Sequence, residues 1–354
     1  MQNLSFQLIS TQKKKMITFN AIMVLINKAQ TTEEQVQNLT TKLGQIKTEI
    51  AKVIFGQEAV IEQILIALLA NGHALIEGVP GLAKTKMVKT IAQATSLQFN
   101  RIQFTPDLMP SDIVGTELLQ TDATGKQYFN FIEGPIMTNL LLADEINRTP
   151  PKTQAALLEA MEERAITYAG KTYKMPQPFF ILATQNPIEL AGTYQLPEAQ
   201  LDRFLLKINI DYPSEAAELQ LLQATAASKK VSISPVLNAT EIIELQSLVN
   251  QVYIDEVLVK KINQLIRQTR SKFSTIEPVK EYVAWGAGPR AGQALIKSAK
   301  AKALLNNRYS VNKSDIKSLL IPVLQHRIVL NHNADLEGIS MNSILQKIVA
   351  HIAL

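Results

Sequence analysis

The chain contains no cysteine. Disulfide bonds, iron–sulfur clusters, thiolate zinc sites and cysteine nucleophiles are therefore all excluded. Histidine is scarce as well, with only four residues: His73, His326, His332 and His351. No two of them stand one helical turn apart, as the ligands of a helical metal site would. We expect all four histidines to have structural or surface roles.

Long apolar runs are also missing, since none approaches the roughly 18 residues that a membrane-spanning helix needs. Residues 16–26 are apolar and follow three lysines, as in a signal peptide. However, Thr18 and Asn20 interrupt this stretch and no small-residue cleavage site follows it. We therefore expect a cytoplasmic protein. The net charge of +5 is too small to indicate nucleic-acid binding by itself.

The length of 354 residues indicates two domains, at about 100–200 residues for each. Residues 1–40 are polar with short apolar patches and are predicted to form an extension or a loosely attached helix. Strand and helix patterns alternate over residues 41–212, which predicts an α/β domain. Beyond Tyr212 and Pro213 helical periodicity dominates, so residues 213–354 are predicted to form a smaller, all-α domain.

Alternating strands and helices predict a parallel sheet flanked by helices. The strand candidates are residues 73–77, 140–143 and 179–183, and residues 84–95 are a helix candidate. The second and third strand candidates are continuous apolar runs, which are typical of parallel strands buried on both faces. Two stretches interrupt this order, at residues 117–131 and 165–175, and each is predicted to form an inserted hairpin.

The loop after the first strand candidate reads Gly-Val-Pro-Gly-Leu-Ala-Lys-Thr over residues 78–85. A P-loop has glycine, four residues, glycine, lysine and serine or threonine. Gly78, Gly81, Lys84 and Thr85 fit, whereas Ala83 replaces the second signature glycine. In such a loop Lys84 reaches the β- and γ-phosphates and the Thr85 hydroxyl holds Mg²⁺. Ala83 is compatible with this role if its backbone stays helical. The alternative is a simple Gly/Pro turn before a basic helix.

The second strand candidate ends in two carboxylates, Asp144 and Glu145, about 60 residues after the loop. The carboxyl ends of parallel strands form the ligand-binding edge of such sheets. Asp144 can hold Mg²⁺, and Glu145 can orient and activate the water that attacks the γ-phosphate. An ordinary acidic turn is the alternative, but the two motifs together predict hydrolysis of a nucleoside triphosphate.

Three further polar residues are candidates for the same reaction. Asn186 follows the third strand candidate and could position the attacking water; an ordinary strand-ending turn is the alternative. Arg203 stands near the end of a short helix and could enter a neighbouring subunit's site, where an arginine finger contributes roughly 10³–10⁵ in rate. A surface ion pair with Glu198 or Asp202 is the alternative. Arg290 lies in a first helical turn and could meet nucleotide from the second domain, or it could simply be solvated.

These motifs arrive in the order of an AAA+ ATPase, and the chain resembles the MoxR family of that superfamily over residues 42–330. The most specific segments are EGVPGLAKT at 77–85, DEINRTPPKTQ at 144–154 and ATQNP at 183–187. LPEAQLDRF at 196–204 and GPRA at 288–291 add to the resemblance. Alanine at position 83 is normal for this family.

The resemblance implies a role for each matching residue. Glu145, Asn186 as sensor 1, Arg203 as a finger acting in trans and Arg290 as sensor 2 would be catalytic. Thr85 and Asp144 would hold Mg²⁺. The residues that would bind ATP are Gly78, Val79, Pro80, Gly81, Leu82, Ala83, Lys84, Thr85, Asp144, Gly56 and Gln57, the last two with Val53 and Ile54 beside the adenine. The predicted all-α domain, residues 213–354, would be the family's helical lid, and the family's helix-2 and pre-sensor-1 insertions match the two hairpins.

The resemblance also implies partners. Family members form homo-oligomeric rings, usually hexamers, and assist the maturation of protein complexes, often with a von Willebrand factor A domain partner. A nucleic-acid motor is an alternative, to which Lys126, Lys171 and Lys174 in the hairpins give slight support. A nucleotide switch without turnover is a second alternative, against which Glu145 and Asn186 argue. A small-molecule kinase is disfavoured by the paired acids and the long helical lid.

Overall fold

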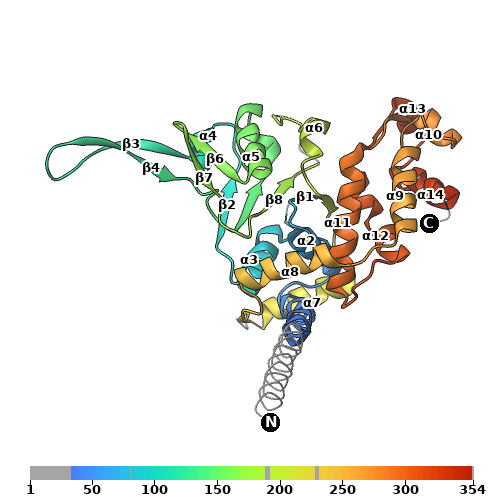
Figure 1. Ribbon diagram of the computed structural model, residues 1–354, viewed down its shortest axis with the longest axis horizontal. Helices are drawn as coiled ribbons and strands as arrows, with labels where there is room; N and C mark the ends of the chain where they lie inside the picture. Colours follow the sequence, from blue (N-terminus) through green and yellow to red (C-terminus); the bar gives the residue numbers. More distant parts are fainter. Residues whose placement is uncertain (1–32, 80, 188–191, 228–230, 353–354) are drawn as a thin grey trace, which may run out of the picture. The chain divides into compact units, whose positions relative to one another are not determined.

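The computed structural model describes residues 33–79, 81–187, 192–227 and 231–352 (Figure 1). The chain divides into two compact units, residues 1–43 and 44–354. In the first unit the described residues, 33–43, are helical. The second unit contains all the elements named below and opens with helical residues 44–51. Most of the predicted extension lies outside the described residues, and the predicted domain boundaries stay predictions.

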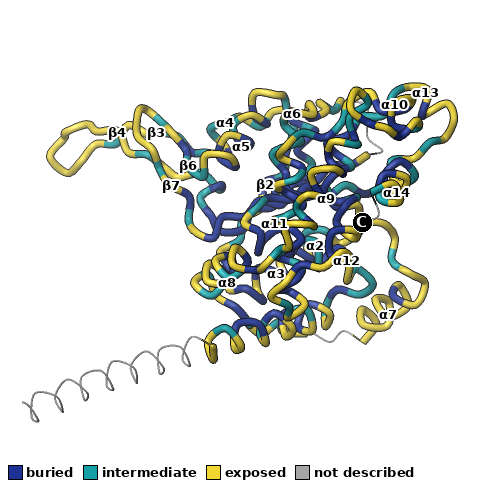
Figure 2. The backbone as a smooth tube through the Cα atoms, turned by 45° about the vertical axis from the view of Figure 1, so that its right-hand side comes forward, coloured by how far each residue is buried: buried dark blue, intermediate teal, exposed yellow. Residues whose placement is uncertain are grey.

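A five-stranded parallel sheet forms the core of the second unit. Its order is β2 (Phe99–Gln103), β5 (Leu140–Asp144), β8 (Phe180–Gln185), β1 (Ala74–Glu77) and β9 (Leu206–Asn209). The three strands predicted from the sequence, β1, β5 and β8, are adjacent in its centre. Every residue of β5 and β8 is buried, as expected for parallel strands covered on both faces. In Figure 2 buried segments, drawn in dark blue, gather beside β2. The predicted α/β fold is confirmed.

Helices connect these strands. In chain order they are α2 (Glu58–Leu69), α3 (Lys84–Ala94), α4 (Pro110–Val114), the 3₁₀ turn η1 (Ile146–Arg148), α5 (Pro151–Glu163) and α6 (Glu198–Leu201). The predicted helix at 84–95 is confirmed as α3. Three fully buried aromatic side chains, Phe104, Phe179 and Phe204, anchor a core in which Leu141 and Ile181 of the central strands also pack. This apolar core supports the strand ends that carry the motifs.

Both predicted hairpins are confirmed. The first pairs β3 (Gly115–Thr121) with β4 (Gln127–Glu133), and the second pairs β6 (Ala165–Tyr168) with β7 (Lys171–Lys174). The turn of the second consists of Ala169 and Gly170, both at positive φ, which matches the twist of two antiparallel strands. The hairpins meet where Phe131 stacks on Tyr173, with ring centroids 4.4 Å apart.

The remainder of the described chain is mainly helical, as predicted. Its helices are α7 (Glu215–Ala226), α8 (Ala239–Gln251), α9 (Glu256–Gln268), α10 (Glu277–Tyr282), α11 (Pro289–Leu305), α12 (Lys313–Leu324), α13 (His332–Leu336) and α14 (Met341–Ile352). Two short strands, β10 (Val283–Trp285) and β11 (Val329–Leu330), pair antiparallel. Among the described residues, no helix has both the length and the apolar character needed to cross a membrane.

Candidate nucleotide site

The carboxyl edge of the sheet brings the predicted motifs together. Glu77 pairs in register with Gln185, and Ala143 pairs with Ala183. Because these strands are parallel, the residues that follow them share one edge. The phosphate loop after β1, the acids at the end of β5 and Asn186 after β8 therefore lie on that edge, as the sequence predicted.

The backbone of the phosphate loop needs small residues. A Cβ atom on Gly78 would lie 2.3 Å from Cγ2 of Ile210 and 2.5 Å from its carbonyl oxygen, so glycine is required there. Gly81 has a φ of +88°, in the left-handed region that favours glycine. The sequence predicted that alanine suits position 83 if its backbone is helical, but the φ of 55° and ψ of 26° of Ala83 make it left-handed. Pro80 lies outside the described residues.

Lys84 is the first residue of α3, and its side chain turns back onto the loop. Its Nζ donates a hydrogen bond to the carbonyl oxygen of Gly78. Burial lowers the pKa of Lys84, while the negative charges of Asp144, Glu145 and Glu77 oppose that shift. The ammonium group therefore lies within the field of both strand-end acids, at the place where a P-loop lysine meets phosphate.

Asp144 is held on both of its carboxylate oxygens. Oδ1 accepts a hydrogen bond from the Thr184 hydroxyl at 2.6 Å, and Oδ2 accepts from Arg101 Nη2 at 2.7 Å. The same Thr184 oxygen accepts the Glu145 backbone N–H at 2.9 Å. Thr184 thus fixes both consecutive acids from the neighbouring strand. Arg101 neutralises the carboxylate that was predicted to be a magnesium ligand.

Glu145 turns sharply out of the strand, with φ 59° and ψ 49°. Its carboxylate accepts a hydrogen bond from Gln103 Nε2 at 2.7 Å and forms an ion pair with Arg148 Nε at 3.1 Å. Sequence reasoning did not identify Gln103, Arg148, Arg101 or Thr184. Thr184 had a usable signal, because it directly follows the predicted strand at residues 179–183 and stands two residues before Asn186.

A mostly apolar cavity of about 410 Å³ adjoins the phosphate loop. Its lining includes Val53, Ile54, Phe55, Gln57, Gly81, Leu82, Ala83, Tyr212, Pro213, Leu221 and Leu222. Gln57 is fixed there by a hydrogen bond from its side-chain amide to the carbonyl oxygen of Asp211, at 2.8 Å. Gly56 has a φ of +70°, and a Cβ on it would lie 2.5 Å from Cβ of Ala217. An apolar cavity that ends at a phosphate-binding loop suits a purine base.

The described residues also fit a magnesium ion carried by a nucleotide. They contain no group of three or more histidine or acidic side chains that could hold a metal by itself. Magnesium needs no such group, because it is usually bound by one or two carboxylates together with substrate phosphates. Asp144 and the Thr85 hydroxyl at the start of α3 are oxygen ligands of the right chemistry for this arrangement.

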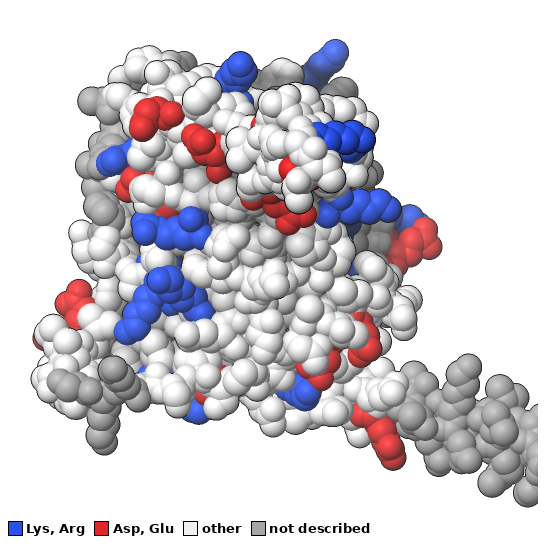
Figure 3. Space-filling model, turned by 90° about the vertical axis from the view of Figure 1, so that its left-hand side faces the viewer, with Lys and Arg blue, Asp and Glu red and all other residues white. Residues whose placement is uncertain are grey.

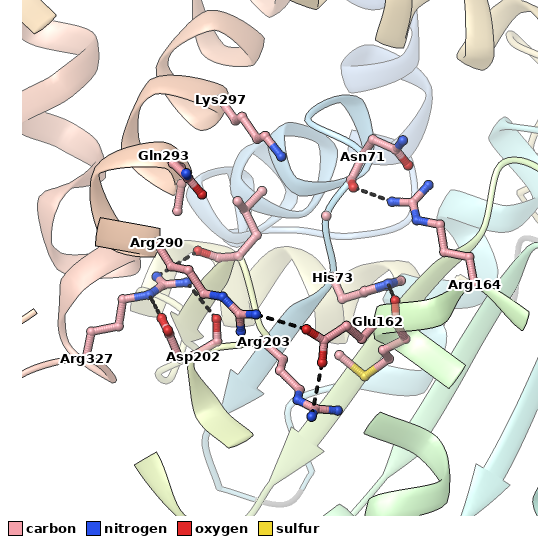
Figure 4. Close-up of a pocket in the computed structure, with 14 residues that line it drawn as sticks. Asn71, His73, Glu162, Arg164, Asp202, Arg203, Arg290, Gln293, Lys297 and Arg327 are labelled. Carbon is pink, nitrogen blue, oxygen red and sulfur yellow. Dashed lines mark hydrogen bonds and ion pairs between the residues drawn. The ribbon is translucent and has the colours of Figure 1, made fainter. Parts of the chain in front are cut away.

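Arg203 and Arg290 lie elsewhere, in a cleft of about 250 Å³ (Figure 4). Gly72 and His73, which immediately precede β1, line this cleft, as does Leu205, which precedes β9. The cleft is therefore at the amino end of these strands, whereas the phosphate loop follows the carboxyl end of β1.

The two arginines meet at one carboxylate. Arg203 Nη2 lies 3.0 Å from Glu162 Oε2, and Arg290 Nη2 lies 2.9 Å from Glu162 Oε1. Arg203 is thus paired with Glu162. The ion pair with Glu198 or Asp202, which the sequence left open as an alternative to the finger, is not the one that the structure shows. The structure places Arg290 beside Arg203 and not beside the phosphate loop of its own chain.

Two family models match the chain. The "ATPase family associated with various cellular activities (AAA)" matches residues 73–206, and the "AAA lid domain" matches residues 277–348. Chaperone MoxR1 of Mycobacterium tuberculosis is 40% identical over 307 residues, which cover 86% of this chain and 80% of that protein. The chain belongs to the MoxR family of AAA+ ATPases. Its membership implies that it binds a nucleotide.

Other similar proteins cover about nine tenths of this MoxR-family chain. The uncharacterized protein YeaC of Bacillus subtilis is 42% identical over 317 residues, or 89% of this chain and 96% of that protein. A crystal structure of a proposed ATPase from Cytophaga hutchinsonii superposes with a TM-score of 0.84 at 40% identity, covering 91% of this chain and 98% of that one. The α/β core with a helical lid is therefore the family's architecture.

Proposed function

We propose that this MoxR-family chain hydrolyses ATP to ADP and phosphate, with magnesium, in a ring of identical subunits. Lys84 and the backbone of the loop bind the phosphates, and Gly56 and Gln57 border the base. Thr85 and Asp144 hold the magnesium ion, which neutralises phosphate charge when bound. Glu145 orients and activates the attacking water, and Asn186 helps to position it.

The proposal of a ring rests on one observation: the phosphate loop lies at one end of β1, and Arg203 and Arg290 lie at the other. A strand of this length spans roughly 15 Å, so Arg203 is not within reach of the nucleotide that its own loop binds. A neighbouring chain that packs its phosphate loop against the cleft would bring its nucleotide to both Arg203 and Arg290. Head-to-tail contacts of this kind form a ring where the rotation between successive subunits closes on itself, and a hexamer is the form we propose.

We propose a protein client, with chaperone-like remodelling or maturation of a protein complex as the result. The first hairpin supports this choice because it exposes five large apolar side chains: Leu118, Leu119, Tyr128, Phe129 and Ile132. Leu119 and Phe129 face each other across the two strands. Exposed apolar side chains of this kind can bind unfolded or partly folded protein segments. We also propose that the protein acts with a partner that contains a von Willebrand factor A domain, and that it is cytoplasmic.

Charge argues against the nucleic-acid alternative at this hairpin. Residues 115–133 contain one basic residue, Lys126, against three acids, Glu117, Asp122 and Glu133. Backbone phosphates would be repelled by this net negative charge. Lys171 and Lys174 make the second hairpin basic, but on the face shown in Figure 3 lysine and arginine side chains are interspersed with acids. This face does not form a continuous basic surface.

The variant Arg203→Ala tests whether each ATP site is shared between neighbouring subunits. Its ATP hydrolysis is assayed while ring assembly is followed by light scattering. Turnover should fall by roughly 10³-fold or more with the ring intact, because a trans-acting finger stabilises the transition state. Arg267→Ala, at an exposed arginine on α9, is the matched control and should keep its turnover. Full activity of assembled Arg203→Ala would refute the shared site.

The client is tested separately with Glu145→Gln, which should bind ATP without hydrolysing it. Rings trapped in this state should retain a protein client through purification. Recovery of nucleic acid alone, together with DNA-stimulated hydrolysis that weakens steeply with salt, would replace the chaperone proposal with the motor alternative.

A further inference from the structure

The cleft at the amino end of the sheet is strongly basic. Five cationic side chains line it: Arg164, Arg203, Arg290, Lys297 and Arg327. Only two carboxylates, Glu162 and Asp202, line the same cleft. Such an excess of positive charge favours an anionic ligand, which the proposed function identifies as the nucleotide of a neighbouring chain.

The two carboxylates have different partners. Asp202 accepts a hydrogen bond from Arg327 Nε at 2.7 Å, and Arg327 is almost completely buried. Glu162 pairs with the more exposed arginines, Arg203 and Arg290. Asp202 therefore belongs to the internal structure, whereas Glu162 organises the cations that face the cleft (Figure 4).

The geometry at Glu162 leaves both arginines able to bind a second anion. Each of its carboxylate oxygens takes one Nη2 group, one from Arg203 and one from Arg290. Arg203 Nη1 donates to the carbonyl oxygen of Leu158 at 2.9 Å, which fixes the plane of that guanidinium. A guanidinium has five N–H donors in a rigid plane, so each arginine keeps further donors for phosphate oxygens.

Without Glu162, two like charges from different elements would face each other. Arg203 lies in the turn after α6, and Arg290 is the second residue of α11. A shared carboxylate offsets their repulsion and sets their spacing before any phosphate arrives. Preorganised charges of this kind stabilise a transition state without the cost of reorganising them during the reaction.

We propose that Glu162 is a positioning residue that holds Arg203 and Arg290 as a pair for the nucleotide of the neighbouring subunit. This inference rests on the proposed function, because it requires that the arginines act in trans. Glu162 is the penultimate residue of α5 and touches neither the phosphate loop nor the strand-end acids of its own chain in any contact that the structure describes.

The variant Glu162→Gln tests the proposal with little change in shape. Its amide NH₂ group would face one of the two guanidiniums as a second donor, so the pair would separate. We expect kcat to fall roughly 10-fold, less than on loss of the finger itself, with KM changed by less than about 2-fold. Glu163→Gln is the matched control: Glu163 is the exposed next residue and forms no ion pair with the described residues. It should behave as the unmodified protein.

Mixed rings distinguish positioning in trans from a structural role. Glu145→Gln chains have no working acid but keep an intact arginine pair. In an equal mixture with Glu162→Gln chains, one interface in four combines the intact acid of a Glu162→Gln chain with the intact arginine pair of a Glu145→Gln chain. Random assembly should therefore restore about a quarter of full turnover per chain. If Glu162 acted only on its own chain's site or fold, the mixture would show roughly one-twentieth of full turnover per chain. Only half of the chains would then hydrolyse ATP, each at roughly a tenth of the normal rate.

Three results would overturn the inference: Glu162→Gln turning over like Glu163→Gln, a loss accompanied by dissociation of the ring, or a mixture without restored activity. A separate outcome concerns the function on which it rests. If assembled Arg203→Ala keeps its turnover, the shared site itself is refuted. If Arg203→Ala is inactive while Glu162→Gln is fully active, only the positioning role fails.

Discussion

Arg327 donates a hydrogen bond to the Asp202 carboxylate at 2.7 Å from a side chain that is only 3% exposed. Its Nη atoms also donate to the carbonyl oxygens of Phe204 at 2.6 Å and Leu205 at 3.2 Å. Burial lowers the pKa of Arg327, and its hydrogen bond to Asp202 opposes this shift. One buried guanidinium thus ties the turn that carries Arg203 to the segment after α12.

Replacing Arg327 with methionine should therefore destabilise the fold strongly. The change removes the donor to the Asp202 carboxylate and the hydrogen bonds to four backbone carbonyl oxygens. Breaking a buried ion pair from one side costs about 3–5 kcal/mol. Urea unfolding followed by circular dichroism measures the loss. Arg267→Met, at an exposed position on α9, should change the unfolding free energy by less than about 1 kcal/mol. Equal effects of the two variants would show that the buried contacts add little.

The parts of the fold that the sequence predicted are those with strong apolar patterns. Strands β5 and β8 are buried along their whole length, so their runs are visible without a structure. Strand β2 was missed because it is an edge strand in which only Ile102 is buried. Its residues Arg101 and Gln103, which contact Asp144 and Glu145, could not be assigned to the site without the pairing of β2 with β5.

The phosphate loop and the strand-end acids could be predicted because each motif is local in sequence. The arrangement of Arg203 and Arg290 could not, since they are 87 positions apart and meet only through Glu162. Glu162 itself has no distinguishing pattern, because a Glu-Glu pair near the end of a helix is usually solvated. Long-range charge pairs depend on how the elements pack, which periodicity does not report.

Thr184 is expected to support catalysis through both acids. Thr184→Val keeps the shape of the side chain but removes the hydroxyl that donates to Asp144 and accepts the Glu145 N–H. Leaving these buried groups unpaired should cost about 1–3 kcal/mol of stability and lower kcat roughly 10-fold through misplaced acids. Thr184→Ser retains the hydroxyl and should retain most of the turnover. Steady-state ATP hydrolysis compares the two, and indistinguishable rates would contradict this role.

Ala83 offers a substitution that should stabilise the protein. Its left-handed backbone, at φ 55°, costs an alanine roughly 1–2 kcal/mol, a cost that glycine avoids. Part of this gain is offset because glycine loses more conformational freedom on folding. We expect Ala83→Gly to raise the unfolding free energy by about 0.5–1 kcal/mol without weakening nucleotide binding, as measured by urea unfolding and calorimetric titration. Destabilisation would mean that the alanine methyl makes a favourable contact.

Gly78→Ala should have the opposite effect at the other end of the loop. The added methyl would overlap both the side chain and the carbonyl oxygen of Ile210. Because that oxygen belongs to the backbone, a change of side-chain rotamer cannot relieve the overlap. The loop must therefore shift away from its phosphate-binding position. We expect nucleotide affinity to fall at least roughly 10-fold in titration, because backbone N–H groups would no longer converge on the phosphates. Unchanged affinity would show that the loop adapts without loss.

His73 should make the stability of the fold depend on pH. It is buried: its Nδ1 accepts the Ile181 N–H at 3.0 Å, and its Nε2 contacts the Met161 carbonyl oxygen at 3.2 Å. Burial, with a smaller effect of the Arg164 charge, lowers its pKa from 6.5 to about 4. The unfolded chain therefore takes up a proton below pH 6.5 that the folded chain refuses until about pH 4, so stability is complete above pH 6.5 and is lost as the pH falls.

The loss from His73 alone should reach about 2 kcal/mol between pH 7.5 and pH 5. Burial also lowers the pKa of His326, so the two histidines act in the same direction. Urea unfolding at a series of pH values measures the slope in the protein and in His73→Gln, which keeps a hydrogen-bond donor but does not titrate. The variant should be less stable at pH 7.5 and should have a shallower slope between pH 7 and pH 5. An unchanged slope would mean that His73 is not the group that takes up the proton on unfolding.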